Sequence, residues 1–296
     1  MTAAIESLPA AQAGTITLGG DLTVNRLGYG AMRITGKGIW GPPDDPAAAL
    51  ATLRRAVELG VNFIDTADSY GPNVSEELIA EALFPYPKDL VITTKVGWTR
   101  HGAGVWQHNA SPTHIEEAIA GSLKRLRLDR IDVYQLHVPD PATSFDASIE
   151  ALARLRERGM VRHVCLSNLT LEHIERARKI VPIVSVQNRY SFSDREWDYV
   201  LDHCQANGIA FMPWGPMAQG RKANEAVEKI AAARNASTAV VSLAWLLRRS
   251  PVTLLIPGTG SVKHLEENVS AAAFRLTDAE FADLGAVVPK PYWLRG

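Results

Sequence analysis

The sequence predicts an α/β fold in which short buried strands alternate with helices about eight times. Two observations support this class. Eight short apolar, β-rich runs recur along the 296 residues, and longer segments with helical periodicity separate them. No Pro-, Gly- or Ser-rich linker divides the chain, so we expect one domain over residues 1–296. Such alternation has two common solutions, an open doubly wound sheet and a closed (β/α)8 barrel.

The eight candidate strands are bounded by polar or turn-forming residues and are short enough to be buried on both faces. They span residues 26–30, 62–65, 90–95, 131–137, 161–167, 184–187, 209–213 and 252–257. Before the first of them, Thr15 to Thr23 predicts a β-hairpin that turns at Gly19-Gly20-Asp21.

Helix starts are marked by capping residues. Ser111 precedes Pro112, which is the pattern of an N-cap followed by proline at the first helical position. The apolar residues that follow repeat at helical spacing; they are Ile115, Ile119, Leu123 and Leu126. The pairs Ser193–Glu196 and Thr277–Glu280 fit the capping-box spacing, and the second predicts an extra C-terminal helix.

A glycine pattern at residues 36–41, G-K-G-I-W-G, matches the dinucleotide fingerprint of doubly wound folds. Its context is wrong, because Pro42, Pro43 and Pro46 follow it and no helix opens there. We interpret residues 36–41 as a flexible loop, which favours the barrel with an N-terminal hairpin and an extra C-terminal helix.

Composition excludes several partners. There are 31 Lys+Arg and 32 Asp+Glu, so no basic surplus is present to bind nucleic acid or an anionic membrane. Cys165 and Cys204 form no disulfide framework, which is typical of the reducing cytoplasm. The N-terminus has no signal-peptide pattern, and no apolar run approaches membrane-spanning length. We expect a cytoplasmic protein, monomeric, that acts on small molecules.

Reactive side chains stand where the predicted strands end, which is where barrel enzymes carry their chemistry. Asp65 ends the second strand, Tyr70 follows in the loop, Lys95 ends the third strand and His137 ends the fourth. A lysine in such a place is costly to bury unpaired, and Asp65 on the neighbouring strand is its expected counter-charge.

Together these four residue types indicate proton transfer to a developing oxyanion. An ammonium about 4 Å from a tyrosine contributes roughly 4 kcal/mol at a dielectric near 20, which lowers the pKa of the phenol by at most about 3. Lys95 could instead attack a carbonyl as the nucleophile of a Schiff-base lyase, but Asp65 favours its charged form. No HxH or HExxH pattern indicates a metal.

The chain resembles the aldo-keto reductases, which are (β/α)8-barrel oxidoreductases with a nicotinamide cofactor. The most specific match is N-F-I-D-T-A-D-S-Y-G at residues 62–71, and T-T-K at 93–95 and Q-L-H at 135–137 add to it. The resemblance implies a complete catalytic tetrad of Asp65, Tyr70, Lys95 and His137. It also leaves a third reading open, a non-catalytic cofactor-sensing subunit.

The resemblance further implies a set of cofactor-binding residues at the strand ends. They are Gly30, Met32, Asp65, Ser167, Asn168, Gln187, Trp214, Gly215, Pro216, Met217, Gln219, Arg221, Pro257, Gly258, Thr259, His264, Glu267 and Asn268. Ser167, Asn168 and Gln187 would bind the carboxamide, and Trp214 would stack on the nicotinamide. The helix that begins near Ser261 would add backbone donors for a phosphate.

Two departures bear on the cofactor. Many members place Lys and Arg where this chain has Gly258 and His264. The loss weakens the case for NADP over NAD, although Arg221 or Lys263 would be placed to compensate. We expect NADPH, with NAD as the alternative.

The region around residues 33–43 resembles a bacterial subgroup that includes pyridoxal reductases, which points to aromatic aldehydes. Aromatic residues in loops and in the C-terminal tail are candidates for the wall of the substrate pocket. They are Trp40, Trp98, Trp106, Tyr292 and Trp293. In the loop 97–109, Arg100 is expected to be a solvated surface residue or to meet an anionic group.

Overall fold

A curved sheet of seven parallel strands forms the centre of the molecule, which is described by a computed structural model over residues 8–217 and 221–287. The strands follow each other around the sheet in chain order. They are β3 (Tyr29–Gly30), β4 (Phe63–Asp65), β5 (Val91–Val96), β8 (Ile131–Leu136), β9 (Val161–Ser167), β10 (Ile183–Arg189) and β11 (Ala210–Trp214). All carboxyl ends therefore meet at one side of the sheet.

The segment 252–258 closes the sheet into a barrel. It pairs with β11 through the Leu254 amide, which donates to the Phe211 carbonyl at 2.9 Å. On its other side the Leu255 amide donates to the Arg26 carbonyl, and the Gly28 amide donates to the Leu255 carbonyl, both at 2.8 Å. The predicted barrel is confirmed, with the difference that its eighth strand makes only isolated bridges.

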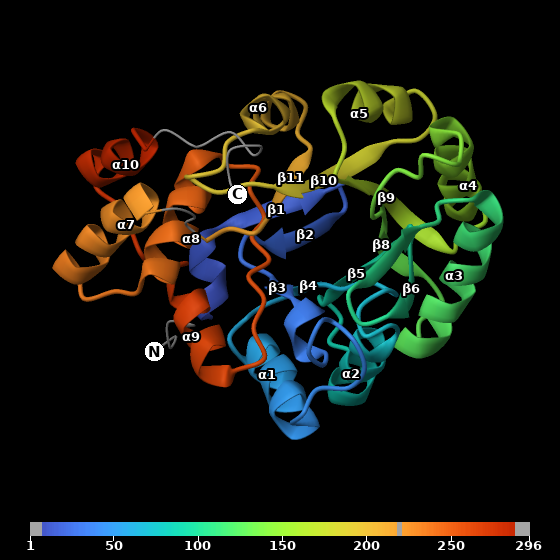
Figure 1. The fold of residues 1–296 in the computed structure, drawn as a ribbon, viewed down its shortest axis with the longest axis horizontal. Coiled ribbons are helices and arrows are strands. Elements are labelled where there is room, and N and C mark those ends of the chain that lie inside the picture. Colours follow the sequence, from blue (N-terminus) through green and yellow to red (C-terminus); the bar gives the residue numbers. More distant parts are fainter. Residues whose placement is uncertain (1–7, 218–220, 288–296) are drawn as a thin grey trace, which may run out of the picture.

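Ten α-helices among the described residues cover the outside of the barrel (Figure 1). They are α1 (Pro46–Glu58), α2 (Val74–Leu83), α3 (Pro112–Leu126), α4 (Phe145–Glu157), α5 (Leu171–Arg178), α6 (Asp198–Ala206), α7 (Arg221–Ala233), α8 (Thr238–Arg249), α9 (Val262–Ser270) and α10 (Asp278–Gly285). Two short 3-10 helices, η1 (Pro9–Ala13) and η2 (Ala31–Ile34), precede α1.

The predicted cap of α3 is confirmed, because the Ser111 side chain accepts from the His114 amide. The capping box at Thr277 and Glu280 is confirmed at the start of the extra helix α10. The box at Ser193–Glu196 is wrong. The backbones of Ser191 and Asp194 bond to each other in a tight turn, and α6 begins only at Asp198, without a side-chain cap.

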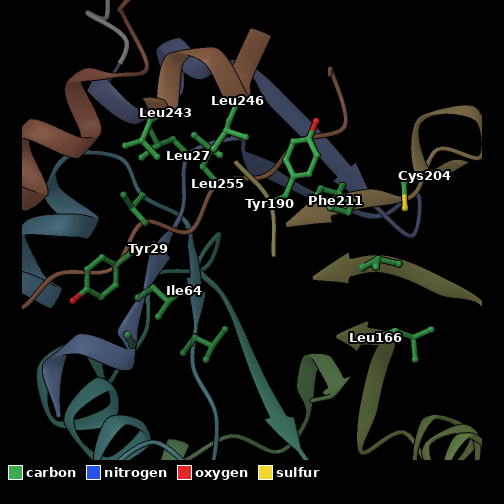
Figure 2. Close-up of a cluster of buried hydrophobic side chains, with 14 of the residues drawn as sticks. Leu27, Tyr29, Ile64, Leu166, Tyr190, Cys204, Phe211, Leu243, Leu246 and Leu255 are labelled. Atoms are coloured by element: carbon green, nitrogen blue, oxygen red, sulfur yellow. The ribbon is translucent and has the colours of Figure 1, made fainter. Parts of the chain in front are cut away.

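Two hydrophobic clusters hold the layers together. One lies between the strands and the outer helices, where Leu243 and Leu246 of α8 pack near Leu27 and Leu255 (Figure 2). The buried polar side chains of the site lie elsewhere, inside the barrel. The outer cluster therefore supports the strands from behind and leaves the interior for chemistry.

The second cluster fills the amino-terminal end of the barrel. The predicted hairpin is present as β1 (Thr15–Leu18) and β2 (Leu22–Asn25). Its Leu18, Leu22 and Val24 are buried against strand residues such as Phe63 and Val133. The hairpin therefore closes this end, and the carboxyl ends of the strands are left for the functional site.

The segment 97–109, which was expected to be a loop, contains a second hairpin of β6 (Trp98–Gly102) and β7 (Val105–His108). In the described part of the chain, no single helix has the length and apolar composition to span a membrane. Helices α7 and α8 meet that test only as a pair bent by 101°.

Candidate active site

Asp65, Tyr70 and Lys95 meet at the carboxyl end of β4 and β5. The Lys95 Nζ lies 2.6 Å from Asp65 Oδ2 and 3.4 Å from the Tyr70 hydroxyl, and it also donates to the Thr66 carbonyl at 2.8 Å. The ammonium thus stands between a carboxylate and a phenol. The counter-charge predicted for Lys95 is confirmed.

Lys95 is fully buried. Burial is the largest single influence and lowers the pKa of its ammonium, but the Asp65 carboxylate and Tyr70 together outweigh burial and hold the pKa above its usual value. Lys95 is therefore a permanent cation at neutral pH. Such a cation is a poor nucleophile, so the pairing favours proton transfer over Schiff-base formation.

Tyr70 is buried, and burial raises the pKa of its phenol, while the nearby Lys95 ammonium acts in the opposite direction. The expectation that Lys95 brings this pKa below its ordinary value is therefore wrong for the unliganded protein. The reason is that the free-energy cost of removing a phenolate from water exceeds the electrostatic stabilisation that one ammonium at 3.4 Å provides. Tyr70 keeps its proton at neutral pH.

His137, which follows β8, lies beside Tyr70. The two rings form an edge-to-face pair with centroids 5.8 Å apart. Burial and the charge of Lys95 hold the pKa of His137 well below its usual value. Its Nδ1 is a buried atom without a hydrogen-bond partner among the described residues. His137 is therefore a neutral ring next to the phenol.

Two glutamine side chains hold the other oxygen of Asp65. The Nε2 atoms of Gln135 and Gln187 donate to Asp65 Oδ1 at 2.9 and 3.0 Å. Gln187, which is also expected to bind the carboxamide of a cofactor, turns its amide nitrogen to the carboxylate in the unliganded protein. This role of Gln135 was not predicted, although a polar residue two positions before His137 in an apolar strand was the available signal.

Ser167 ends β9 and Asn168 follows it, and the Asn168 side chain connects His137 to Trp214. The Asn168 Nδ2 donates to the His137 carbonyl and to Ser167 Oγ, both at 3.0 Å. Its Oδ1 accepts from the Trp214 indole at 3.0 Å. The indole is thereby fixed in orientation while the ring is 39% exposed, which leaves it available for stacking.

A glycine cradle lies between β3 and the closing strand. A Cβ at Gly258 would stand 2.7 Å from the Gly30 carbonyl oxygen, and a Cβ at Gly30 would stand 2.6 Å from the Ile256 carbonyl oxygen. A side chain at 258 would therefore require the neighbouring backbone of β3 to shift. The two glycines therefore permit the close approach of β3 and the closing strand at the carboxyl end of the barrel.

The remaining cofactor candidates lie at or after the ends of β3, β11 and the closing strand. Met32 belongs to η2, Pro257 and Thr259 flank Gly258, and Gly215, Pro216 and Met217 follow β11. Helix α9 begins after Ser261 as predicted and carries His264, Glu267 and Asn268. Gln219, Tyr292 and Trp293 lie outside the described residues, as does the side chain of Arg221.

An aromatic wall borders the site. The Trp98 ring meets His137 edge to face at 6.4 Å and Trp106 at 5.7 Å. Trp40 is 36% exposed. Arg100 is neither solvated nor placed for an anion, because it is buried and donates to four backbone carbonyls. Both expectations for Arg100 are therefore wrong.

The described residues contain no group of three or more His, Cys, Asp or Glu side chains that could hold a metal ion. What the site offers is a buried ammonium, a protonated phenol, a neutral imidazole and an exposed indole face beside a glycine cradle. The exposed indole face fits a planar ring such as a nicotinamide, with the ammonium, the phenol and the imidazole in the same site.

Residues 26–289 match the aldo/keto reductase family, and the chain belongs to it. Aldo-keto reductases are oxidoreductases that use nicotinamide cofactors. An uncharacterised oxidoreductase of Schizosaccharomyces pombe is 45% identical over 96% of this chain and 92% of its own length. The pyridoxine 4-dehydrogenase of Escherichia coli is 42% identical over 92% of this chain and 98% of its own length. This similarity confirms the predicted likeness to the pyridoxal-reductase subgroup.

Solved structures agree with this membership. A thermostable aldo-keto reductase in complex with the inhibitor epalrestat has a TM-score of 0.81 and 30% identity, over 92% of this chain and 99% of that one. An aldo-keto reductase of Klebsiella pneumoniae in complex with NADPH has a TM-score of 0.78 and 25% identity, over 94% and 96%.

Proposed function

We propose that this protein reduces aldehydes or ketones to alcohols with a nicotinamide cofactor, and that Tyr70 is the proton donor. The observation that carries the proposal is the buried Lys95 ammonium, which bonds Asp65 at 2.6 Å and the Tyr70 hydroxyl at 3.4 Å. Reduction of a carbonyl leaves an alkoxide, and an alkoxide needs a proton from a positioned acid.

The cofactor, when bound, supplies the hydride that the carbonyl carbon accepts. Tyr70 transfers its hydroxyl proton to the carbonyl oxygen. Lys95 stabilises the phenolate that this transfer creates, because its charge lies within hydrogen-bond reach of the phenol oxygen. Asp65 keeps Lys95 charged and in place. His137, which is neutral, donates a hydrogen bond to the same carbonyl oxygen and orients it.

The cofactor is proposed to be NADPH, with NADH as the alternative. Trp214 would stack on the nicotinamide, and Ser167, Asn168 and Gln187 would hold its carboxamide. In the unliganded protein the Trp214 indole donates a hydrogen bond to Asn168 Oδ1. This hydrogen bond would have to break for the Asn168 amide to bind the cofactor. The NADPH complex of the Klebsiella pneumoniae relative supports the first choice, and the glycine at 258 supports the alternative.

The substrate is proposed to be an aromatic aldehyde such as pyridoxal. Trp98 and Trp106 border His137, so a flat ring would be held between apolar faces while its carbonyl meets Tyr70. Similarity to the pyridoxine 4-dehydrogenase of Escherichia coli supports the same substrate class.

The test is oxidation of NADPH and of NADH, followed by absorbance, with 4-nitrobenzaldehyde, pyridoxal and a panel of aliphatic carbonyls. We expect turnover of aromatic aldehydes with at least one cofactor. Absence of turnover across the panel, together with tight cofactor retention, would instead favour a cofactor-sensing subunit. Capture of a substrate on Lys95 by borohydride would favour the lyase.

A further inference from the structure

Arg100 occupies an unusual place beside the site. It lies in β6 and is only 9% exposed, yet no carboxylate pairs with its guanidinium in the described part of the chain. Its donors go to backbone instead. Nε bonds the Val105 carbonyl at 3.2 Å, Nη1 bonds Ile39 at 3.0 Å and Ser69 at 2.9 Å, and Nη2 bonds Gly38 at 3.3 Å.

These acceptors belong to three separate segments. Gly38 and Ile39 lie in the loop 36–41 before α1, Ser69 lies in the loop that carries Tyr70, and Val105 belongs to β7. One side chain therefore ties three loops together around the mouth of the barrel. A planar guanidinium with five N–H groups suits this task, whereas a single ammonium cannot reach carbonyls in so many directions.

Two indoles cover the guanidinium. The carbon between its nitrogens lies 3.6 Å from the centre of the Trp106 ring and 5.6 Å from that of Trp40. Trp106 in turn meets Trp98, and Trp98 meets His137. These ring contacts therefore connect Arg100 through Trp106 and Trp98 to His137, beside which the carbonyl is proposed to bind.

The loop 36–41 needs such a restraint. Ile39 has φ of 58°, a left-handed conformation that a β-branched residue strongly disfavours. Besides the bonds from Arg100, this loop is anchored outside itself by the Gly41 amide, which donates to the Gly71 carbonyl at 2.6 Å. Without the bonds to Gly38 and Ile39, the segment that carries Trp40 would relax away from the barrel mouth.

We propose that Arg100 is a positioning residue that clamps the loop 36–41 to the β6–β7 hairpin, and thereby fixes Trp40 and Trp106 as the wall that selects flat aromatic carbonyl substrates. The selectivity for aromatic carbonyls rests on the proposed reductase function. The clamp itself does not, because it is a property of the unliganded chain.

The clamp is tested by proteolysis, which needs no activity. Lys37 is exposed within the clamped loop, and Lys88 is an exposed lysine remote from it. In Arg100→Met, we expect endoproteinase Lys-C to cut at Lys37 at least about tenfold faster than in the parent protein, with cutting at Lys88 unchanged. Arg100→Lys should be intermediate.

Two comparisons separate the clamp from general destabilisation. Arg156→Met is the matched control, because Arg156 is exposed and also donates to a backbone carbonyl, that of Arg162, far from the site. This control should leave cutting at Lys37 unchanged. Faster cutting at Lys88 as well, or no change at Lys37 in Arg100→Met, would overturn the clamp.

The selectivity is tested by steady-state kinetics of the same variants. Arg100→Met should raise KM for 4-nitrobenzaldehyde several-fold and leave both KM and kcat for propanal nearly unchanged, because propanal has no ring for the wall to hold. An equal effect on both aldehydes, or none, would overturn the role in selectivity. If the parent protein reduces no carbonyl, the proposed function fails while the proteolysis result still decides the clamp.

Discussion

Removing the Lys95 ammonium should abolish most of the activity and leave the barrel intact. In Lys95→Met, the phenolate of Tyr70 loses a positive charge 3.4 Å from its oxygen. At an effective dielectric near 20, that charge contributes about 5 kcal/mol to the phenolate before desolvation is subtracted. Each 1.4 kcal/mol or so corresponds to tenfold in rate, so we expect kcat to fall by roughly a hundredfold to a thousandfold.

The same substitution leaves the Asp65 carboxylate buried without its partner, since Asp65 is only 3% exposed. Breaking a buried pair in this way costs about 3–5 kcal/mol of the free energy of unfolding. The double variant Asp65→Asn/Lys95→Met removes both charges. It should recover much of the lost thermal stability without recovering kcat, which separates folding from catalysis.

The assay is oxidation of NADPH with saturating 4-nitrobenzaldehyde, with the unfolding midpoint of each variant measured in parallel. Lys88→Met is the control, because Lys88 is exposed and distant from the site, and it should behave as the parent protein does. A folded Lys95→Met variant with kcat within a few-fold of the parent value would refute the proposed role of the ammonium.

Three further predictions concern buried side chains, namely Gln135, the pair His137 and Tyr70, and Asp68, which is buried in the loop that carries Tyr70. Gln135→Leu removes a hydrogen-bond donor to Asp65. Because one hydrogen bond to a charged group is lost, kcat should fall by about tenfold with little change in KM. An unchanged kcat would refute a positioning role for Gln135. The kcat/KM of the parent protein should be flat from about pH 6 to about pH 9, because the pKa of His137 in the unliganded protein is held well below its usual value and that of Tyr70 above it. An acid limb centred near the ordinary histidine value would contradict this. Burial raises the pKa of Asp68 well above its usual value. The folded chain therefore keeps a proton that the unfolded chain releases. As a result, the free energy of unfolding falls as the pH rises towards the folded-state pKa, by at most about 1.4 kcal/mol per pH unit. The unfolding midpoint of Asp68→Asn minus that of the parent should therefore grow as the pH rises above the ordinary carboxyl pKa, and a constant difference would contradict the assignment.

The sequence was informative where local pattern decides structure. Buried strands appear as apolar runs, and the motif at residues 62–71 carries Asp65 and Tyr70 at a strand end, where barrels place reactive groups. The predicted strand boundaries were less accurate where the barrel closes. There β3 is only two residues long, because closely approaching glycines at 28, 30 and 258 replace regular pairing with single bridges.

Arg100 could not have been understood from the sequence. Its acceptors on Gly38, Ser69 and Val105 come together only when three loops fold against one another. A lone arginine in a polar loop has no local signal for such a role. The raised pKa of Tyr70 was not predicted for a related reason, since the cost of burying a phenolate depends on the whole surrounding structure rather than on the distance to Lys95.

The central claim is that the phenol of Tyr70 supplies the proton. Its most direct test is Tyr70→Phe, with kcat for 4-nitrobenzaldehyde and the Kd for NADPH measured on the same preparation. We predict that kcat falls by at least about a hundredfold while Kd is unchanged, because the ring is kept and only the acid is lost. A variant that binds NADPH normally and retains kcat within a few-fold of the parent value would contradict the claim.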